Sequence, residues 1–268
     1  MRKLQAILRD MGQVLVAFSG GVDSSFLLKT AADTLGSGVY AVIASSPTYP
    51  EREIRGARAL ARKLNVACEV VRTEEMDNPE FTSNSPLRCY HCKKELMARL
   101  KNIAENRNIG VVIDGQNADD RDDYRPGAKA AAELGVRSPL REAGLGKAEI
   151  RTLSRRLGLP TWDKPSLACL ASRFPYHTAI TAANLRRVSE AEAALTRLGF
   201  RQVRVRHHGD VARIEVPPRD LRRIMSPEIR TRLSRALKKA GYAYVALDVD
   251  GYRTGSLNET LGSTFKRR

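Results

Sequence analysis

The sequence predicts an α/β protein in which an N-terminal domain with a parallel sheet is followed by a smaller α+β domain. In the N-terminal part, short β-rich apolar segments alternate with helical patterns, as is typical of right-handed βαβ units. After Pro175 the order becomes helix, strand, strand, helix, strand, which indicates a small α+β domain of ferredoxin-like type. The length of 268 residues is sufficient for one large domain or two modest ones.

Each element of the first domain, residues 1–175, is expected from its apolar period. Strands are expected at 14–18, 39–45, 66–72 and 111–114. Helices are expected at 24–35, 51–64, 89–106, 128–134 and 147–157. Ligands bind beyond the carboxyl ends of parallel strands, so residues that follow these strands are the first candidates for a site.

The second domain, residues 176–258, combines two helices with three strands. The expected elements are a helix at 181–198, a hairpin of 202–207 and 211–216 about Gly209-Asp210, a helix at 229–240 and a strand at 242–248. Residues 259–268 are expected to form a basic tail.

A small-residue turn between the first strand and the first helix indicates an anion site. Its sequence is Ser19-Gly20-Gly21-Val22-Asp23-Ser24-Ser25. Glycines let the backbone approach an anion, serines add hydroxyl donors, and the helix start supplies free N–H groups. It is not a Walker A loop, which ends in Gly-Lys-Ser/Thr. The alternative, an ordinary turn with a serine N-cap, does not require two glycines and three serines.

Acidic residues follow the strand expected at 111–114. Asn117, Asp119 and Asp120 lie where a ligand crevice is expected. These side chains could bind Mg²⁺ or orient a nucleotide. The alternative is a solvated acidic loop that continues through Asp122 and Asp123.

Three of the four cysteines are candidates for chemistry. Cys89 and Cys92 form a Cys-x-x-Cys at a helix start, and Cys169 lies far downstream. A redox pair, half a zinc site and part of an iron–sulfur site all fit the pair. Three thiolates favour a cluster with one open iron position, or a zinc completed by His91 or water. Cys68 lies in a strand pattern, where a buried hydrophobe is the default.

Charged side chains in the second domain suggest a further site. Strand alternation places Arg204 and Arg206 on one face, and a pair of arginines suits a phosphate. A solvated sheet face is the alternative. Glu192 falls inside the apolar stripe of its helix, and an inward carboxylate needs a partner such as arginine or a metal. A slightly rotated helix would leave Glu192 at the boundary instead.

The composition favours anionic partners in the cytoplasm. The formal net charge is +16, and residues 176–268 contain 19 Lys and Arg against 9 Asp and Glu. A GC-rich genome would give the same excess of arginine. Several arginines are expected on exposed helix faces: Arg222, Arg223, Arg230, Arg232 and Arg235. No signal peptide or membrane-spanning stretch is expected, and four cysteines do not make a disulfide framework.

Several motifs occur together in one order. They are the 19–25 turn, Pro50-Glu51-Arg52-Glu53, Arg88-Cys89-Tyr90-His91-Cys92-Lys93, Asp114-Gly115-Gln116-Asn117-Ala118-Asp119-Asp120, Arg125-Pro126-Gly127, Ser138-Pro139-Leu140, Lys164-Pro165-Ser166, Cys169-Leu170-Ala171-Ser172-Arg173 and Gly251-Tyr252-Arg253-Thr254-Gly255-Ser256. The turn resembles the PP-loop of ATP pyrophosphatases. The combination, over about residues 1–259, resembles the LarE family of ATP-dependent pyridinium-3,5-biscarboxylic acid mononucleotide sulfurtransferases.

The resemblance implies a PP-loop domain of the adenine nucleotide alpha-hydrolase-like fold, with ATP and Mg²⁺ as cofactors. Members adenylate a carboxylate of the pyridinium mononucleotide and replace its oxygen by sulfur, on the way to the nickel-pincer nucleotide of lactate racemase. The loop residues 19–25 would bind the leaving pyrophosphate, with Asn117 and Asp119 beside it. Asp23 would hold the metal or orient the loop. Family members are often hexameric, so a homo-oligomer is implied.

The resemblance also assigns roles to the sulfur and substrate residues. Cys169 matches a cysteine that some members sacrifice as sulfur donor, whereas in others three cysteines, here Cys89, Cys92 and Cys169, hold a 4Fe–4S cluster. Arg204 and Arg206 would grip the substrate phosphate, and Ser172 and Arg173 would bind the substrate where they line the sulfur-transfer site. Glu192 and Glu215 become metal or substrate candidates.

The principal alternative is a 4Fe–4S-dependent tRNA thiolase of the same superfamily, for which the basic second domain would be suited. Such enzymes commonly carry further zinc-ribbon cysteines, and only Cys68 remains here. A glutamine-dependent synthetase would need a glutaminase domain, for which the chain has no room. A nucleotide-binding sensor would not need three thiols.

Overall fold

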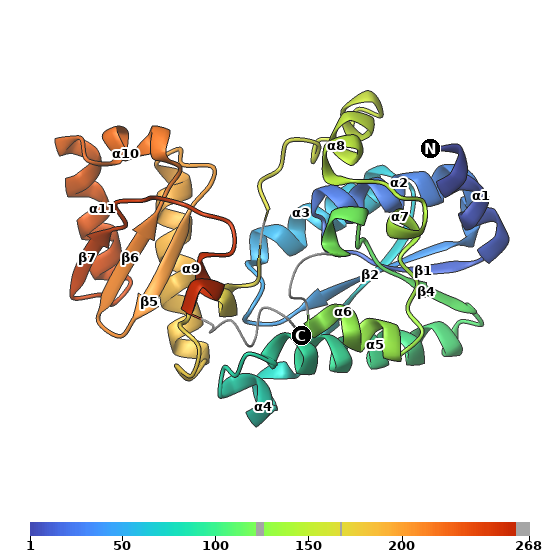
Figure 1. Cartoon of the computed structure of the whole chain (residues 1–268), viewed down its shortest axis with the longest axis horizontal. Coiled ribbons are helices and arrows are strands. Elements are labelled where there is room, and N and C mark those ends of the chain that lie inside the picture. The colour runs from blue at the N-terminus through green and yellow to red at the C-terminus, as the bar shows by residue number, and fades with distance from the viewer. Residues whose placement is uncertain (122–125, 167, 261–268) are drawn as a thin grey trace. The chain divides into compact units, whose positions relative to one another are not determined.

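The computed structural model describes residues 1–121, 126–166 and 168–260, and the chain forms two compact units (Figure 1). The first unit comprises Met1–Glu75 and Leu87–Leu167. The second unit comprises Met76–Pro86 and Ala168–Arg268. The basic tail expected at 259–268 lies outside the described residues beyond position 260.

The sheet of the first unit is parallel, as predicted. Its strands are β1 (Val14–Ala17), β2 (Val39–Ser45), β3 (Ala67–Arg72) and β4 (Val111–Ile113), in the order β3-β2-β1-β4. Every pairing between them is parallel. The carboxyl ends of β1 and β4 are therefore neighbours at one edge of the sheet, where the predicted site residues follow both strands.

Helices cover both faces of this sheet. They are α1 (Arg2–Met11), α2 (Val22–Leu35), α3 (Glu51–Lys63), α5 (Arg88–Asn106), α6 (Pro126–Glu133), α7 (Pro139–Glu142) and α8 (Lys147–Arg156). Val14 and Val16 of β1 pack in the core of α1, α2, α3 and α8, whereas Leu15 packs in the core of α5 and α6. The strands are thus apolar on both faces, as strands buried between two helical layers are.

The second unit contains one helix-covered sheet of three strands. Its elements are α4 (Pro79–Thr82), α9 (Ala182–Arg197), β5 (Arg204–His208), β6 (Val211–Glu215), α10 (Pro218–Ile224), α11 (Pro227–Lys239) and β7 (Tyr244–Leu247). The hairpin β5–β6 is antiparallel, as predicted, and β7 pairs in parallel with β6. The ferredoxin-like expectation is wrong, because a ferredoxin-like unit has four strands and the described sheet has three.

The second unit includes residues 76–86, which lie in the sequence between the two segments of the first unit. Phe81, in the segment 76–86, is 1% exposed. The side-chain amide of Asn84 donates to the carbonyl oxygens of Phe174 and Pro175 at 3.4 and 2.7 Å. Residues 168–175 also group with the second unit, whereas the sequence predicts that the first domain ends at 175.

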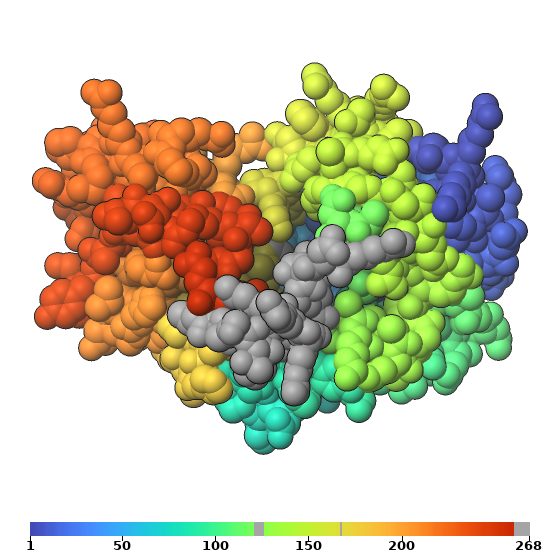
Figure 2. Space-filling view, in the orientation of Figure 1, coloured from blue at the N-terminus to red at the C-terminus, as the bar shows by residue number. Residues whose placement is uncertain are grey.

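The arginines expected on helix faces of the second unit are exposed. Arg222 and Arg223 on α10, and three arginines on α11, are exposed. In Figure 2 the segment that contains these helices, in orange, forms part of the visible surface. The buried residues of the same helices, such as Leu233 and Leu237, pack on the sheet. Charge therefore accumulates on the outer surface of these helices, opposite their apolar stripe.

Candidate active site

The loop between β1 and α2 has the form of an anion site. Gly21 is the N-cap of α2, so the first-turn N–H groups of the helix have no intrahelical acceptor. The hydroxyls of Ser19 and Ser24 lie 2.9 Å apart beside them. Val22 and Ser25, also predicted for this site, are buried at 4% and 0% exposure and do not line the cavity described below.

Two glycines are required for the close packing of this loop. Gly20 has φ +69°, and a Cβ there would lie 2.8 Å from the Cβ of Ala57 on α3. A Cβ on Gly115, after β4, would lie 3.0 Å from the backbone nitrogen of Ser24. The loop after β4 therefore approaches the start of α2 to a distance that a larger residue would prevent.

A cavity of about 430 Å³ lies where these loops meet. Residues from the β1–α2 loop, the loop after β4, α5 and α8 line it: Ala17, Ser19, Gly21, Asp23, Ser24, Lys93, Asp114, Gly115, Gln116, Asn117, Asp119, Asp120, Lys147 and Ser166. Asn117 and Asp119 are predicted to lie beside the loop, and both line the same cavity as the loop residues. The cavity is polar, charged and of a size suited to a small ligand.

Asp23 has one paired and one unpaired carboxylate oxygen. Its Oδ2 accepts a charge-assisted hydrogen bond from Lys147 Nζ. Its Oδ1 is buried and has no hydrogen-bond partner among the described residues, and the same holds for Gln116 Oε1. Unpaired carboxylate and amide oxygens are the ligands that a hard cation prefers, so these two residues fit Mg²⁺ in chemical type.

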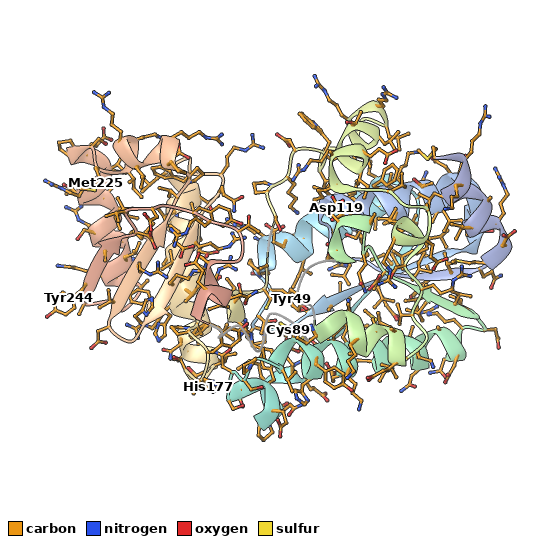
Figure 3. All side chains as sticks on the ribbon, in the orientation of Figure 1. Tyr49, Cys89, Asp119, His177, Met225 and Tyr244 are labelled. Atoms are coloured by element: carbon orange, nitrogen blue, oxygen red, sulfur yellow. The ribbon has the colours of Figure 1, made fainter. Side chains whose placement is uncertain are left out.

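Asp119 caps a helix rather than standing unpaired in the cavity. Its Oδ2 accepts from the backbone N–H of Lys147, the first residue of α8, at 2.7 Å. Gly146 is the N-cap of that helix, and a Cβ there would meet Asp119 Oδ1 at 2.9 Å. Asp119 therefore positions Lys147. Figure 3 shows Asp119 near the start of α8.

Three lysines of this region were not predicted as site residues, although Lys93 and Lys164 stand in two of the motifs given above. Lys147 pairs with Asp23, Lys93 lies 3.8 Å from Asp114, and Lys164 donates to Gly20 O at 2.8 Å and contacts Glu53 at 2.6 Å. One signal was present for Lys147. A cation in the first turn of a helix opposes the helix dipole, so its position there needs another reason.

A smaller cavity adjoins the polar one. Its volume is about 120 Å³, and it shares Ala17, Ser19 and Lys93 with the larger cavity. The remaining lining is mainly apolar: Phe18, Val42, Ile43, Ala44, Tyr49, Glu53, Ile54, Leu96 and Leu100. An apolar slot beside a polar phosphate-type site is suited to the flat base of a nucleotide.

The predicted thiols occur in both units. Cys89 is exposed and Cys92 is half-buried, and both lie in the first turns of α5 in the first unit. Figure 3 labels Cys89. Cys169 is half-buried and precedes a short 3₁₀ turn, Leu170–Arg173, in the second unit. Thiolates are the correct donors for a 4Fe–4S cluster. The described part of the chain forms no group of three His, Cys, Asp or Glu side chains that could hold a metal, so the cluster stays a prediction.

Cys68 is in β3, as predicted, and is half-buried. Burial raises the pKa of its thiol, which the neighbouring Arg58 lowers only in part. A thiol with a raised pKa is a poor nucleophile, which agrees with a packing role.

The two predicted arginines of β5 are buried, at 5% for Arg204 and 6% for Arg206. A solvated sheet face is therefore excluded. Arg206 forms a bidentate pair with Glu215 at 2.8 and 2.9 Å. Burial, and then the positive charge of Arg173, lower the pKa of Arg204 to about 10.

Buried charged residues of the second unit cluster about β5. Arg173 and Glu192 form a second bidentate pair, at 2.7 and 3.1 Å. Arg204 lies in the same cluster, where the charges of Arg173 and Glu192 both act on its guanidinium group. Buried guanidinium groups gathered in this way are suited to an anionic ligand.

Glu192 and Glu215 have arginine partners. The sequence left arginine or a metal as the partner of Glu192, and the structure shows Arg173 at its carboxylate. Arg206 forms an ion pair with Glu215 in the same way, and Arg213 Nη2 lies 3.3 Å from Glu215 Oε1. A metal at these two carboxylates stays a prediction.

Comparison with known proteins gives three relatives. No family model matches the chain. The pyridinium-3,5-bisthiocarboxylic acid mononucleotide synthase of Lactiplantibacillus plantarum is 40% identical over 96% of this chain and 93% of its own length. An uncharacterised protein of Synechocystis is 44% identical over 97% of both chains, and one of Methanocaldococcus jannaschii is 29% identical over 90% and 91%. No helix among the described residues has the length and apolar character needed to cross a membrane.

Proposed function

Because this chain belongs to the LarE family, at 40% identity over 96% of its length to a pyridinium-3,5-bisthiocarboxylic acid mononucleotide synthase, we propose that it catalyses the same sulfur transfer. A carboxylate of pyridinium-3,5-biscarboxylic acid mononucleotide attacks the α-phosphorus of ATP, and pyrophosphate leaves. A sulfur nucleophile then attacks the acyl carbon, AMP leaves, and a thiocarboxylate remains. The product belongs to the biosynthesis of the nickel-pincer nucleotide cofactor of lactate racemase.

The cavity of about 430 Å³ in the first unit is the proposed ATP site, and it is the observation that carries the mechanism. Ser19, Ser24 and the first N–H groups of α2 would stabilise the charge that develops on the leaving pyrophosphate. Lys147 would add a cation at the same place. Mg²⁺, held by Asp23 and Gln116, would neutralise phosphate charge when bound.

The smaller cavity is the proposed base site. It shares Ser19 and Lys93 with the phosphate cavity and is otherwise mainly apolar. A base stacked there would leave the triphosphate directed toward the start of α2. Binding of the base would therefore orient the α-phosphorus for attack.

We propose that the substrate's phosphate binds at Arg204 and Arg206. Burial of Arg204 and Arg206 in one cluster with Arg173 supports this assignment. The Ser172 hydroxyl lies beside the same cluster, at 2.7 Å from Arg173. Replacement of Arg204 by alanine should therefore weaken binding of the pyridinium nucleotide and leave ATP binding nearly unchanged.

The sulfur source has two alternatives. In one, Cys89, Cys92 and Cys169 hold a 4Fe–4S cluster that supplies sulfide. In the other, the Cys169 thiolate attacks the adenylate and is left as dehydroalanine after C–S cleavage. Iron and sulfide analysis of protein purified without oxygen, and mass spectrometry of residue 169 after turnover, distinguish the two.

The decisive experiment compares acceptors. The chain, kept anaerobic with ATP and Mg²⁺, should release pyrophosphate when the biscarboxylate nucleotide is added. Release stimulated by tRNA alone would contradict the proposal and favour a tRNA thiolase, for which the exposed arginines of α10 and α11 would be suited.

We further propose that the enzyme acts in the cytoplasm as a homo-oligomer, with a hexamer as the form that the family resemblance implies. Light scattering of the purified chain tests the assembly. A monomer at micromolar concentration would contradict it.

A further inference from the structure

We infer that Arg173 is a positioning residue that holds the turn carrying Cys169, rather than a ligand of the substrate. The inference deepens the proposed function, on which the role of Cys169 in sulfur transfer rests. In this role the Arg173–Glu192 pair fixes the turn and thereby the position of the Cys169 sulfur atom.

Each nitrogen of the Arg173 guanidinium has acceptors inside the second unit. Arg173 is 1% exposed. Nη1 donates to the carbonyl oxygens of Ala168 and Cys169 at 3.0 and 3.2 Å, and to Ser172 Oγ at 2.7 Å. Nε and Nη2 donate to Glu192. The side chain therefore returns to its own turn and binds the backbone on both sides of the Cys169 Cα.

Glu192 anchors this arrangement to two regular elements. It lies on α9 and is 4% exposed. Its Oε1 accepts from Arg173 Nε at 2.7 Å and from the backbone N–H of Val205, on β5, at 3.0 Å. Charge-assisted, bidentate pairs are the strong and directional ones. The turn is thus bound to a helix and a strand through one carboxylate.

The same turn is bound to the proposed substrate arginine. Ser172 Oγ donates to Cys169 O at 2.9 Å, and Ser172 O accepts from Arg206 Nη1 at 2.7 Å. Arg206 is itself fixed by Glu215. The backbone of Cys169 is therefore oriented by buried ion pairs at both ends of the turn. Such fixed geometry is what a sulfur atom needs in order to attack, or be transferred, at a defined acyl carbon.

The first test measures the reactivity of Cys169 and needs no catalytic activity. Iodoacetamide is reacted with the full-length, reduced, iron-free chain, and mass spectrometry follows alkylation at residue 169. Cys68 on β3 serves as the internal reference. Arg173→Lys keeps the charge but loses the two-pronged geometry, and we expect alkylation of Cys169 to become about tenfold faster. Glu192→Gln, which keeps the shape, should give a smaller increase of about threefold.

The second test separates positioning from substrate binding. In Arg173→Lys, the rate of thiocarboxylate formation should fall about tenfold, while KM for the pyridinium nucleotide stays within about twofold. Arg232→Lys is the matched control, because Arg232 forms an exposed pair with Glu228 on α11. It should change neither quantity.

Two results would overturn the inference. One is an unchanged alkylation rate of Cys169 in both Arg173→Lys and Glu192→Gln. The other is a raised KM with an unchanged rate, which would make Arg173 a substrate ligand as the family resemblance implies. If instead the unaltered chain releases no pyrophosphate, the proposed function fails, and the alkylation test still decides the role of Arg173.

Discussion

Lys147 joins two parts of the proposed ATP site within one residue. Its ammonium pairs with Asp23, and its backbone N–H is bound by Asp119. The position of the cation is thus determined by a helix N-terminus, not by a flexible loop. A lysine placed in this way can meet phosphate oxygens without reorganisation during the reaction.

Substitution of Lys147 by methionine should slow pyrophosphate release about 10² to 10³-fold, because one preorganised charge at the leaving group is lost. The measurement is pyrophosphate production at saturating ATP. Lys29→Met is the control, since Lys29 forms an i,i+4 pair with Asp33 on α2 and does not line the cavity. A comparable loss in both variants would contradict the assignment.

Because of His207, we expect the stability of the second unit to depend on pH. It is 3% exposed, and its Nδ1 lies 3.2 Å from the Tyr242 hydroxyl. Burial, and then the charge of Arg187, lower the pKa of His207. The unfolded chain therefore takes up this proton first as the pH falls below about 6.5, and the free energy of unfolding decreases, by up to about 1.4 kcal/mol per pH unit.

In His207→Gln, the free energy of unfolding should decrease less at low pH than in the unaltered chain. Glutamine keeps a hydrogen bond to Tyr242 but does not titrate. Urea midpoints of both proteins between pH 7.5 and 5 measure it. His208, whose pKa is also lowered, is present in both proteins, so the difference isolates His207. Parallel curves would disprove this explanation.

At the scale of elements, the β1–α2 loop depends on its contact with α3. Gly20 and Gly12 share φ +69°, but only at Gly20 would a Cβ meet another residue, Ala57. Gly12→Ala should therefore cost about 1–2 kcal/mol for the backbone conformation alone. Gly20→Ala should cost about 1–3 kcal/mol more, from overlap with Ala57.

Urea unfolding at constant m-value gives the two costs. ATP binding, measured by calorimetry, should be lost or weakened in Gly20→Ala and retained in Gly12→Ala. Equal destabilisation in the two variants would show that overlap with Ala57 does not contribute to the loss of stability.

The regular elements were predictable because their signals are local. The strands β1 to β4, the helix after the first glycines and the β5–β6 hairpin follow from apolar period and turn residues within short windows. The helix α1 is not among the expected elements, although Leu4 and Leu8 form its buried stripe.

The site was predictable only where one motif contains its residues. Ser19, Ser24 and Asp23 occur together in the sequence and line one cavity. Lys147 meets Asp23 from far along the chain, and Glu192 meets Arg173 from another helix. No local pattern encodes such pairings. For Arg173 the motif predicts a substrate ligand. Its burial and its hydrogen-bond partners, which favour a positioning role, depend on the folded second unit and are not visible in the motif.

At the scale of the whole molecule, the thiols are distributed over both units. If they share one cluster, replacement of any one of Cys89, Cys92 or Cys169 by alanine should remove most of the bound iron, whereas Cys68→Ala should leave it unchanged. Iron and acid-labile sulfide analysis under anaerobic conditions measures this. Iron retained after loss of Cys169 would restrict any metal site to the Cys89–Cys92 pair.

Residues 76–86 leave the ribosome long before the rest of the unit to which they belong. About 80 residues must still be synthesised before position 168 follows, which takes roughly 4 to 16 seconds at ordinary translation rates. During that interval Phe81 lacks every residue of its unit from position 168 onward. The nascent chain therefore exposes an aromatic side chain while the first unit is completed, and no single cut of the gene can yield both units intact.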